Sequence, residues 1–126
     1  MVKELSVYEL AKAVEMEFGH ILAVEANWKE QTMIATIYKL MLCHFLGDYV
    51  FQTDFLAKTK GENWWHMLAH CVTYTTPFIC FFGLDLNIAV LLLSHLVIDS
   101  AKARYKKINY ASDQLLHIAV MGIYLM

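Results

Sequence analysis

Residues 91–99 read LLLSHLVID, an apolar run that carries two strongly polar side chains, His95 and Asp99, four positions apart. The i, i+4 spacing places both side chains on one face of a helix, one turn apart. Ionisable groups are costly inside a protein core or a membrane, so such a pair needs partners on neighbouring segments. The run therefore predicts a buried helix whose polar face meets other polar faces.

The composition of the chain favours a membrane protein built from helices. Of its 126 residues, 59% are hydrophobic and 17% are charged. Soluble domains are typically about 45–50% apolar and about 25% charged. No strand-like alternation persists along the chain, so we expect an all-α fold. A net charge of −2 gives no reason to expect a nucleic-acid partner.

Four apolar segments follow one another at about 32–56, 63–83, 86–104 and 109–126. A bilayer core about 30 Å thick requires roughly 20 helical residues, which the first two segments reach. The third segment is marginal, and the fourth is short. Trp64 and Trp65 are typical of a membrane interface. We therefore expect a four-helix membrane-embedded bundle over residues 31–126, with a compact soluble bundle as the alternative.

Residues 1–30 predict an extra N-terminal amphipathic helix. Ser6 and Glu9 have the spacing of a capping box, and Val14, Phe18 and Ile21 continue one apolar stripe. The polar face is acidic, whereas helices that adsorb to anionic lipid are rich in Lys and Arg. We expect this arm to dock on a protein partner, on a second copy of the chain, or on the rest of the protein.

Basic residues predict the orientation of the bundle. They occur between the first and second apolar segments and again between the third and fourth. The positive-inside rule then places both basic connections in the cytoplasm and predicts a multi-pass protein of the inner (cytoplasmic) membrane. The residues concerned are Lys58, Lys60, Lys102, Arg104, Lys106 and Lys107.

Each of the four apolar segments carries one polar i, i+4 pair. In an up-down-up-down bundle the pairs on the first and third helices come late, and those on the second and fourth come early. All four pairs are therefore predicted to lie at one level, near the cytoplasmic face. The pairs are His44 and Asp48, His66 and His70, His95 and Asp99, and Asp113 and His117.

Histidine and aspartate at one level of a helical bundle predict a metal site. We assign His44, Asp48, His66, His70, His95, Asp99 and His117 as candidate ligands. They exceed the needs of one divalent ion, so we expect one or two ions, with Zn²⁺ first and Mn²⁺ or Fe²⁺ as alternatives. The alternative interpretation of His66 is a solvated side chain at the membrane interface, and the alternative interpretation of Asp113 is a helix cap.

The surroundings of these pairs suggest an anionic substrate. Lys58, Lys60, Lys102 and Arg104 lie at the same predicted end and could bind a phosphate, although ordinary positive-inside anchors have the same composition. Asp54 and Asp113 are the candidate catalytic carboxylates, with Asp54 as a general base, a further ligand or a partner of Lys58.

The motifs HFLGDYVFQTDFLAKTKG, WWHMLAHCVTYTTPF, LSHLVIDSAKARY and DQLLHIAV, in this order, resemble a bacterial and phage family of small membrane proteins, domain of unknown function 3307. The resemblance covers about residues 38–126 and implies a helical integral membrane protein without assigning an activity. The SHLVID block is also similar to membrane-bound, metal-dependent hydrolases regulated with the bacterial DNA-damage response, although the chain lacks their HR-containing motif.

Three functions remain open at this point. The first is a membrane-embedded metal-dependent hydrolase that acts on a phosphoester or lipid headgroup through a metal-activated water. The second is a non-enzymatic membrane protein with a structural His/Asp metal site or polar cluster and a partner-binding N-terminal helix. The third is an ion or proton pathway, which the scarcity of polar residues in the other halves of the helices disfavours.

Overall fold

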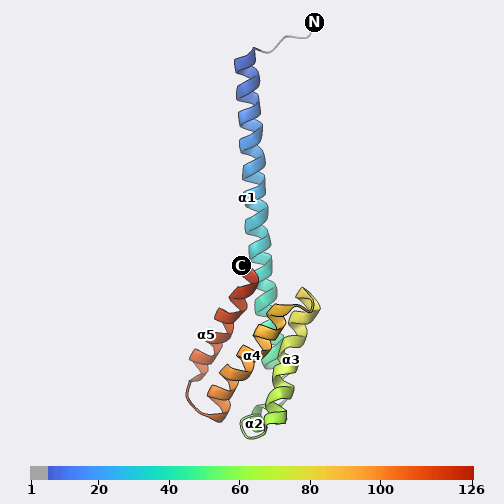
Figure 1. Cartoon of the computed structure of the whole chain (residues 1–126), viewed down its shortest axis with the longest axis vertical. Coiled ribbons are helices and arrows are strands. Elements are labelled where there is room, and N and C mark those ends of the chain that lie inside the picture. Colours follow the sequence, from blue (N-terminus) through green and yellow to red (C-terminus); the bar gives the residue numbers. More distant parts are fainter. Residues whose placement is uncertain (1–5) are drawn as a thin grey trace. The chain divides into compact units, whose positions relative to one another are not determined.

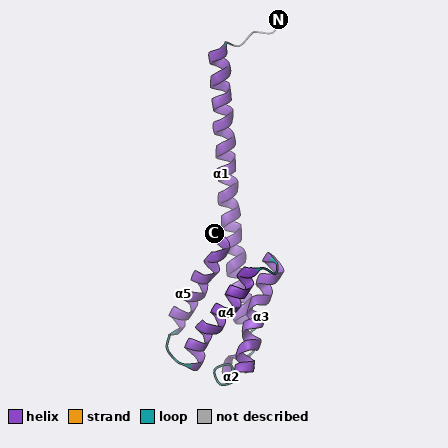
Figure 2. Ribbon diagram, in the orientation of Figure 1, coloured by secondary structure: helices purple, strands orange, loops and turns teal. Residues whose placement is uncertain are grey.

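All regular secondary structure is helical in the part of the chain that the structure, a computed structural model, describes. Residues 6–126 are described, except for the side chains of Val7, Leu10 and Ala11, so residues 1–5 of the predicted arm and the first side chains of its stripe lie outside this part. No strand occurs in residues 6–126 (Figure 2). The α-helices there are α1 (Val7–Phe45), α2 (Asp54–Thr59), α3 (Trp64–Phe82), α4 (Leu86–Asp99) and α5 (Tyr110–Met121).

The chain divides into two compact units, Met1–Ala35 and Thr36–Met126, and α1 contributes residues to both. The sequence predicts an arm over 1–30 and a separate helix from about 32. In the structure α1 instead continues through these positions, because the stretch contains neither Pro nor Gly after Gly19. The hydroxyl of Thr32 donates to the carbonyl of Trp28 one turn earlier, so this polar side chain is satisfied without interrupting the helix.

The first unit is a helix with a capped start and an uncovered apolar stripe. The backbone N–H of Ser6 donates to Glu9, and the backbone N–H of Glu9 donates to the Ser6 hydroxyl at 3.2 Å, which confirms the predicted capping box. The hydrogen bonds that the Glu9 carboxylate accepts from the backbone N–H and the hydroxyl of Ser6 lower the pKa of the Glu9 carboxyl. Phe18 and Trp28 are exposed in the described structure, so the partner predicted for this stripe stays a prediction.

The second unit is a bundle in which α3 packs on α4 and α4 packs on α5 (Figure 1). Side-chain caps begin each of these helices. Asn63 accepts from the backbone N–H of Trp65 and His66, while Asp85 and Asn109 cap α4 and α5. Gly83 ends α3 with a φ of +85°, a conformation that side chains other than glycine rarely adopt.

The bundle buries polar side chains and exposes apolar ones. Its buried apolar cluster is small, and the remaining buried side chains include aspartates and histidines. Large apolar side chains on α3, α4 and α5 face outward instead, among them Val72, Phe81, Val90, Leu93, Val97 and Leu115. This distribution is the reverse of that in a soluble domain, where exposed apolar patches mark contact with a partner or a membrane.

The predicted first membrane helix, residues 32–56, is wrong in detail. After Phe45 the chain makes a π-helical turn over Leu46–Val50, closed by the hydrogen bond from Phe51 N to Leu46 O at 2.9 Å, and α2 begins separately. A second π-helical turn, Ser100–Arg104, follows α4, and a 3-10 turn, Gly122–Leu125, follows α5. The periodicity of the sequence gives no signal for either π-helical turn, because each adds a single residue to a turn of helix; Gly47 lies inside the first turn, but a lone glycine does not by itself predict one.

One segment of the described chain, Leu86–Arg104, is long and apolar enough to cross a membrane, and 33% of its most apolar stretch is buried. The core helix of a soluble protein passes the same test. The remaining helices fall short in length or carry more polar residues.

Gly47 lies where the chain after α1 approaches the backbone of α3. A Cβ atom at this position would lie 2.5 Å from the carbonyl oxygen of Tyr74. We expect Gly47→Ala to cost about 1–3 kcal/mol of unfolding free energy, because the backbone at Tyr74 cannot retreat without moving α3. Thermal unfolding in detergent measures this loss. Gly122→Ala is the matched control, since its Cβ would meet nothing within 4 Å, and equal stability of the two variants would refute the close approach.

Candidate metal centre

The first group of potential ligands joins α3, α4 and the first π-helical turn. It consists of Asp48, His70, His95 and Asp99, all buried, with one ligand atom from each within 4.8 Å of the others. His70 Nε2 lies 3.0 Å from Asp99 Oδ2 and 3.5 Å from Asp48 Oδ1. His95 Nε2 lies 3.0 Å from His70 Nε2. Two imidazoles and two carboxylates thus converge on one point.

The second group brings in α5. Asp48, Asp113 and His117 are all buried and also offer ligand atoms within 4.8 Å of one another. His117 Nε2 lies 3.4 Å from Asp113 Oδ1 and 3.5 Å from Asp99 Oδ1. Asp48 therefore belongs to both groups. Asp99 also faces both, with Oδ2 toward the first and Oδ1 toward the second.

Three of the spacings between these atoms fit the coordination of a small divalent ion, while His70 Nε2 lies closer to Asp99 (3.0 Å) and His95 Nε2 farther from Asp48 and Asp99 (3.9 and 3.8 Å). With ligand bonds of 2.0–2.2 Å, two ligands of a tetrahedral Zn²⁺ lie about 3.3–3.6 Å apart. The three distances from His70 Nε2 to Asp48 and from His117 Nε2 to Asp113 and Asp99, 3.4–3.5 Å, fall in this range. They are long for hydrogen bonds and suit ligands around a common ion.

Several of these buried atoms have no hydrogen-bond partner in the described structure. Buried polar atoms are nearly always hydrogen-bonded, so each exception needs an explanation. For Asp99 Oδ1, Asp113 Oδ1 and His117 Nε2 a bound cation supplies one, because it would accept a lone pair from each of these atoms. His70 Nδ1 is also without a partner, but it lies on the side of the ring away from the ligand group that Nε2 faces.

Two lysines compensate the carboxylates. Lys60 is buried and forms an ion pair with Asp99. Lys102 Nζ lies 2.5 Å from Asp113 and 3.8 Å from Asp99. Buried charges need such partners, since an unpaired one is strongly destabilising. Both lysines were predicted as substrate-binding residues, and the structure places their ammonium groups against candidate metal ligands.

His44 lies beside the two groups and is outside both. Its Nδ1 is 3.1 Å from the Tyr74 hydroxyl and its Nε2 is 2.9 Å from Gln114 Oε1. Gln114 Nε2 then donates to Asp48 and Asp113, each at 3.0 Å. A neutral His44 that donates through Nε2 and accepts from Tyr74 satisfies every group in this chain. The structure therefore gives His44 a role in orienting two carboxylates.

Gln114 and Tyr74 are the residues of the site that the sequence pattern misses. Gln114 directly follows Asp113, and neighbouring residues on a helix do not share a face, so spacing gives no signal for it. The hydroxyl of Tyr74 on α3 is hydrogen-bonded to His44 of α1. The Tyr74 ring also stacks on His95, with centroids 3.7 Å apart and planes 8° from parallel, which fixes the orientation of that imidazole.

The structure places two other predicted residues away from both groups. His66 Nδ1 is hydrogen-bonded with the Thr59 hydroxyl at 2.7 Å, and its ring packs against Phe55. Asp54, a candidate catalytic base, is the exposed first residue of α2. Asp113, the other candidate catalytic residue, lies within the second ligand group.

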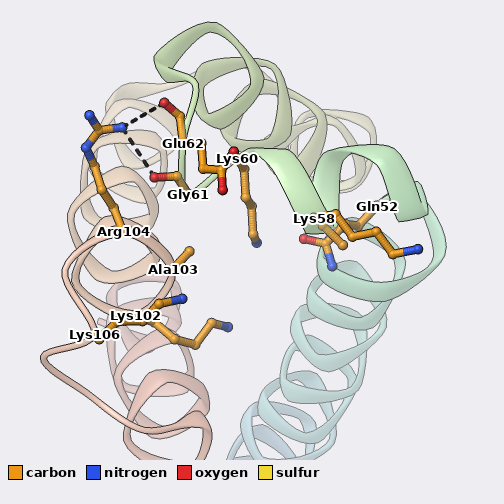
Figure 3. Close-up of a pocket in the computed structure, with 10 residues that line it drawn as sticks. Gln52, Lys58, Lys60, Gly61, Glu62, Lys102, Ala103, Arg104 and Lys106 are labelled. Atoms are coloured by element: carbon orange, nitrogen blue, oxygen red, sulfur yellow. Dashed lines mark hydrogen bonds between the residues drawn. The ribbon is translucent and has the colours of Figure 1, made fainter.

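A basic pocket of about 540 Å³ lies beside the carboxylates. Figure 3 shows its side chains arranged around an open centre, with Arg104 donating to the carbonyl oxygens of Gly61 and Glu62. Lys60 and Lys102 connect the pocket to the ligand groups, because they line it and pair with Asp99 and Asp113. The four predicted substrate-binding residues, Lys58, Lys60, Lys102 and Arg104, all line this pocket.

These features define a class, a helical bundle with a buried His/Asp cluster positioned to hold a metal ion beside a basic pocket. The chain belongs to the family described as protein of unknown function (DUF3307), whose model matches residues 36–126. This confirms the predicted resemblance. No curated protein and no solved structure matches the chain. The likeness to metal-dependent hydrolases stays a prediction.

Proposed function

We propose that this protein is a membrane-embedded, metal-dependent hydrolase that acts on a phosphoester or a lipid headgroup. The observation that carries the proposal is the pair of ligand groups that share Asp48, are both approached by Asp99, and are linked through Lys60 and Lys102 to a basic pocket. In enzymes that hydrolyse phosphoesters, two ions about 3.5–4 Å apart stabilise the attacking and leaving oxygens. Carboxylates that face two ligand groups at once suit this arrangement.

Each group suits one divalent ion. Asp48, His70, His95 and Asp99 would hold the first, and Asp48, Asp113, His117 and Asp99 Oδ1 the second. Imidazole with carboxylate suits Zn²⁺ first, with Mn²⁺ or Fe²⁺ as alternatives. When bound, such ions polarise a phosphoryl oxygen and lower the pKa of a bound water toward neutrality. The side chains of Lys58, Lys106 and Arg104 would hold the substrate phosphate in the pocket.

The membrane setting rests on the inverted distribution of side chains. Aspartate and histidine fill the interior, while the outward faces of α3, α4 and α5 carry Val72, Leu93 and Leu115. Lipid accepts such a surface, whereas water does not. The basic connections on either side of the ligand groups favour the cytoplasmic face of the inner membrane. We propose four embedded helical segments, with α5 too short to span an unperturbed bilayer.

Metal analysis of the purified full chain tests this proposal. We expect two transition-metal ions per chain, and one after either His70→Ala or His117→Ala, because each histidine belongs to a different group. His20→Ala, on the other unit, should keep both ions. The metal-loaded protein should release phosphate from a phosphomonoester, and chelation should stop the release. Absence of stoichiometric metal from the wild-type protein would contradict the proposal.

A second candidate function is a non-enzymatic membrane protein stabilised by its polar cluster. The observation that favours it is the neutralisation of Asp99 by Lys60 and of Asp113 by Lys102, which requires no ion. In this case the exposed stripe of the first unit would recruit a protein partner. A folded protein without stoichiometric metal, or one that binds metal at both groups without any phosphate release, would favour this function over hydrolysis.

A further inference from the structure

A second hollow lies next to the basic pocket and differs from it in chemistry. It is a groove of about 400 Å³, lined almost entirely by apolar atoms, between the start of α3 and the end of α4. Trp64 and Tyr105 supply aromatic faces, and Leu96, Val97 and Ala101 supply aliphatic ones. Lys107 is its only charged lining residue. None of the assigned site residues lines this groove.

The groove and the basic pocket share a wall. Arg104 of the pocket lies over the ring of Trp64 of the groove, with its guanidinium carbon 4.5 Å from the ring centroid. The π-helical turn Ser100–Arg104 divides its residues between the two hollows. Ser100 and Ala101 line the groove, whereas Lys102, Ala103 and Arg104 line the pocket. A molecule that fills both would be apolar at one end and anionic at the other.

We propose that the two hollows together bind an anionic phospholipid, with its phosphate in the basic pocket and an acyl chain in the groove. This inference rests on the proposed function, because it narrows the substrate class from any phosphoester to a membrane lipid. The charge of the pocket is complementary to a phosphate, since five cationic side chains and one carboxylate line it. Two of the cations, Lys58 and Lys106, are exposed and available to a ligand.

The position of the groove supports a lipid over a water-soluble phosphoester. It runs along Leu86–Arg104, the segment of the described chain that is apolar enough to cross a membrane, and Val97 there is exposed. An aromatic and a basic residue at the rim, Tyr105 and Lys107, are typical of the level at which headgroups meet acyl chains. A soluble phosphoester would use the pocket and leave the groove empty.

Quenching of Trp64 fluorescence by brominated lipid tests the proposal. The full chain with Trp28→Phe and Trp65→Phe keeps Trp64 as its single tryptophan and is placed in phosphatidylcholine nanodiscs with a chelator present. We expect brominated phosphatidic acid to reach half-quenching at a mole fraction about tenfold lower than brominated phosphatidylcholine, because charge-assisted hydrogen bonds hold only the anionic headgroup.

Matched variants assign the two ends of the lipid. Lys58→Gln with Lys106→Gln should remove the preference for phosphatidic acid, whereas Lys39→Gln, outside the pocket, should keep it. Ala101→Phe fills the groove and should weaken quenching by phosphatidic acid about tenfold. Equal quenching by both lipids, or an unchanged preference in the double lysine variant, overturns the proposal. So does displacement of the lipid by soluble glycerol phosphate at an equal concentration.

The same samples separate this inference from the proposed function. Bound metal and phosphate release without headgroup-dependent quenching would overturn lipid binding and leave the hydrolase intact. Headgroup-dependent quenching in a protein that binds no metal would overturn the hydrolase and leave a lipid-binding membrane protein.

Discussion

Replacing Asp99 by asparagine is expected to remove both metal ions from the protein. The two carboxylate oxygens of Asp99 face different ligand groups, Oδ2 toward His70 and Oδ1 toward His117. An amide cannot offer two anionic oxygens, so both ions lose a ligand and the charge that attracts them. Loss of a residue that only orients a ligand already weakens metal binding about 10–100-fold, and Asp99→Asn should exceed this range. Metal analysis and calorimetric titration with Zn²⁺ measure the change.

The control for this variant is Asp54→Asn. Asp54 is exposed at the start of α2 and belongs to neither ligand group, so its removal should leave the metal content unchanged. The comparison also decides the role predicted for Asp54. Phosphate release that falls with both ions still bound would support a general base, while unchanged release would exclude that role.

Folding of the Asp99 variant needs a separate check, because Lys60 would lose its buried partner at a cost of about 3–5 kcal/mol. Asp48→Asn avoids this difficulty. Asp48 belongs to both groups, and its partners in the described structure are histidines and Gln114, with no lysine among them. Retention of two tightly bound ions in either folded variant would contradict the shared-ligand geometry.

The sequence predicts the members of this site better than their roles. Spacing of four residues identifies the helix face, and the order of the segments identifies the level, so Asp48, His70, His95, Asp99, Asp113 and His117 are all found from the sequence. Neither the spacing nor the order of the segments tells whether a side chain on the polar face of its helix reaches the two ligand groups. His66 has the same spacing as the others and instead is hydrogen-bonded to Thr59.

His44 shows why the roles escape prediction. On a regular α-helix His44 and Asp48 would lie one turn apart on a common face. The π-helical turn Leu46–Val50 changes the number of residues per turn between them, so Asp48 enters both ligand groups while His44 meets Gln114. A π-helical turn of this kind depends on tertiary packing, which the sequence does not display. Here the packing is the close approach of Gly47 to the backbone of Tyr74.

The fold, like the site, is predicted from the sequence only where local signals exist. Capping residues and apolar lengths predict α3, α4 and α5 to within a few residues, because their ends carry local signals such as Asn63, Gly83 and Asn109. No comparable local signal predicts that α1 continues through residue 31. The composition changes there from polar to apolar, but this change reflects different surroundings and does not end the helix. Composition describes what a helix contacts, and end signals describe where it stops.

Lys60→Met is expected to make the stability of the protein depend on metal far more than in the wild type. Without an ion, Lys60 is the cation that neutralises the fully buried Asp99. Removing it leaves Asp99 with only the more distant Lys102 ammonium, 3.8 Å away and already paired with Asp113, and should cost about 3 kcal/mol in the metal-free protein. A divalent ion restores the missing charge, so Zn²⁺ should recover most of this loss. Thermal unfolding in detergent, with chelator and with saturating Zn²⁺, measures both effects.

The direction of this coupling follows from competition for one carboxylate. In the wild type a bound ion would compete with the Lys60 ammonium for Asp99, so the lysine should weaken metal binding. In Lys60→Met that competitor is absent, and Zn²⁺ should bind at least tenfold more tightly. At saturation each tenfold gain adds about 1.4 kcal/mol to the stabilisation by the ion. Lys58→Met removes an exposed lysine of the same pocket and should match the wild type in both conditions. An equal Zn²⁺-induced rise of the unfolding temperature in Lys60→Met and Lys58→Met would mean that Lys60 and the ion do not compete for Asp99. Lys60 would then be a permanent counter-charge of Asp99, and a bound metal ion would not displace its ammonium group into the pocket.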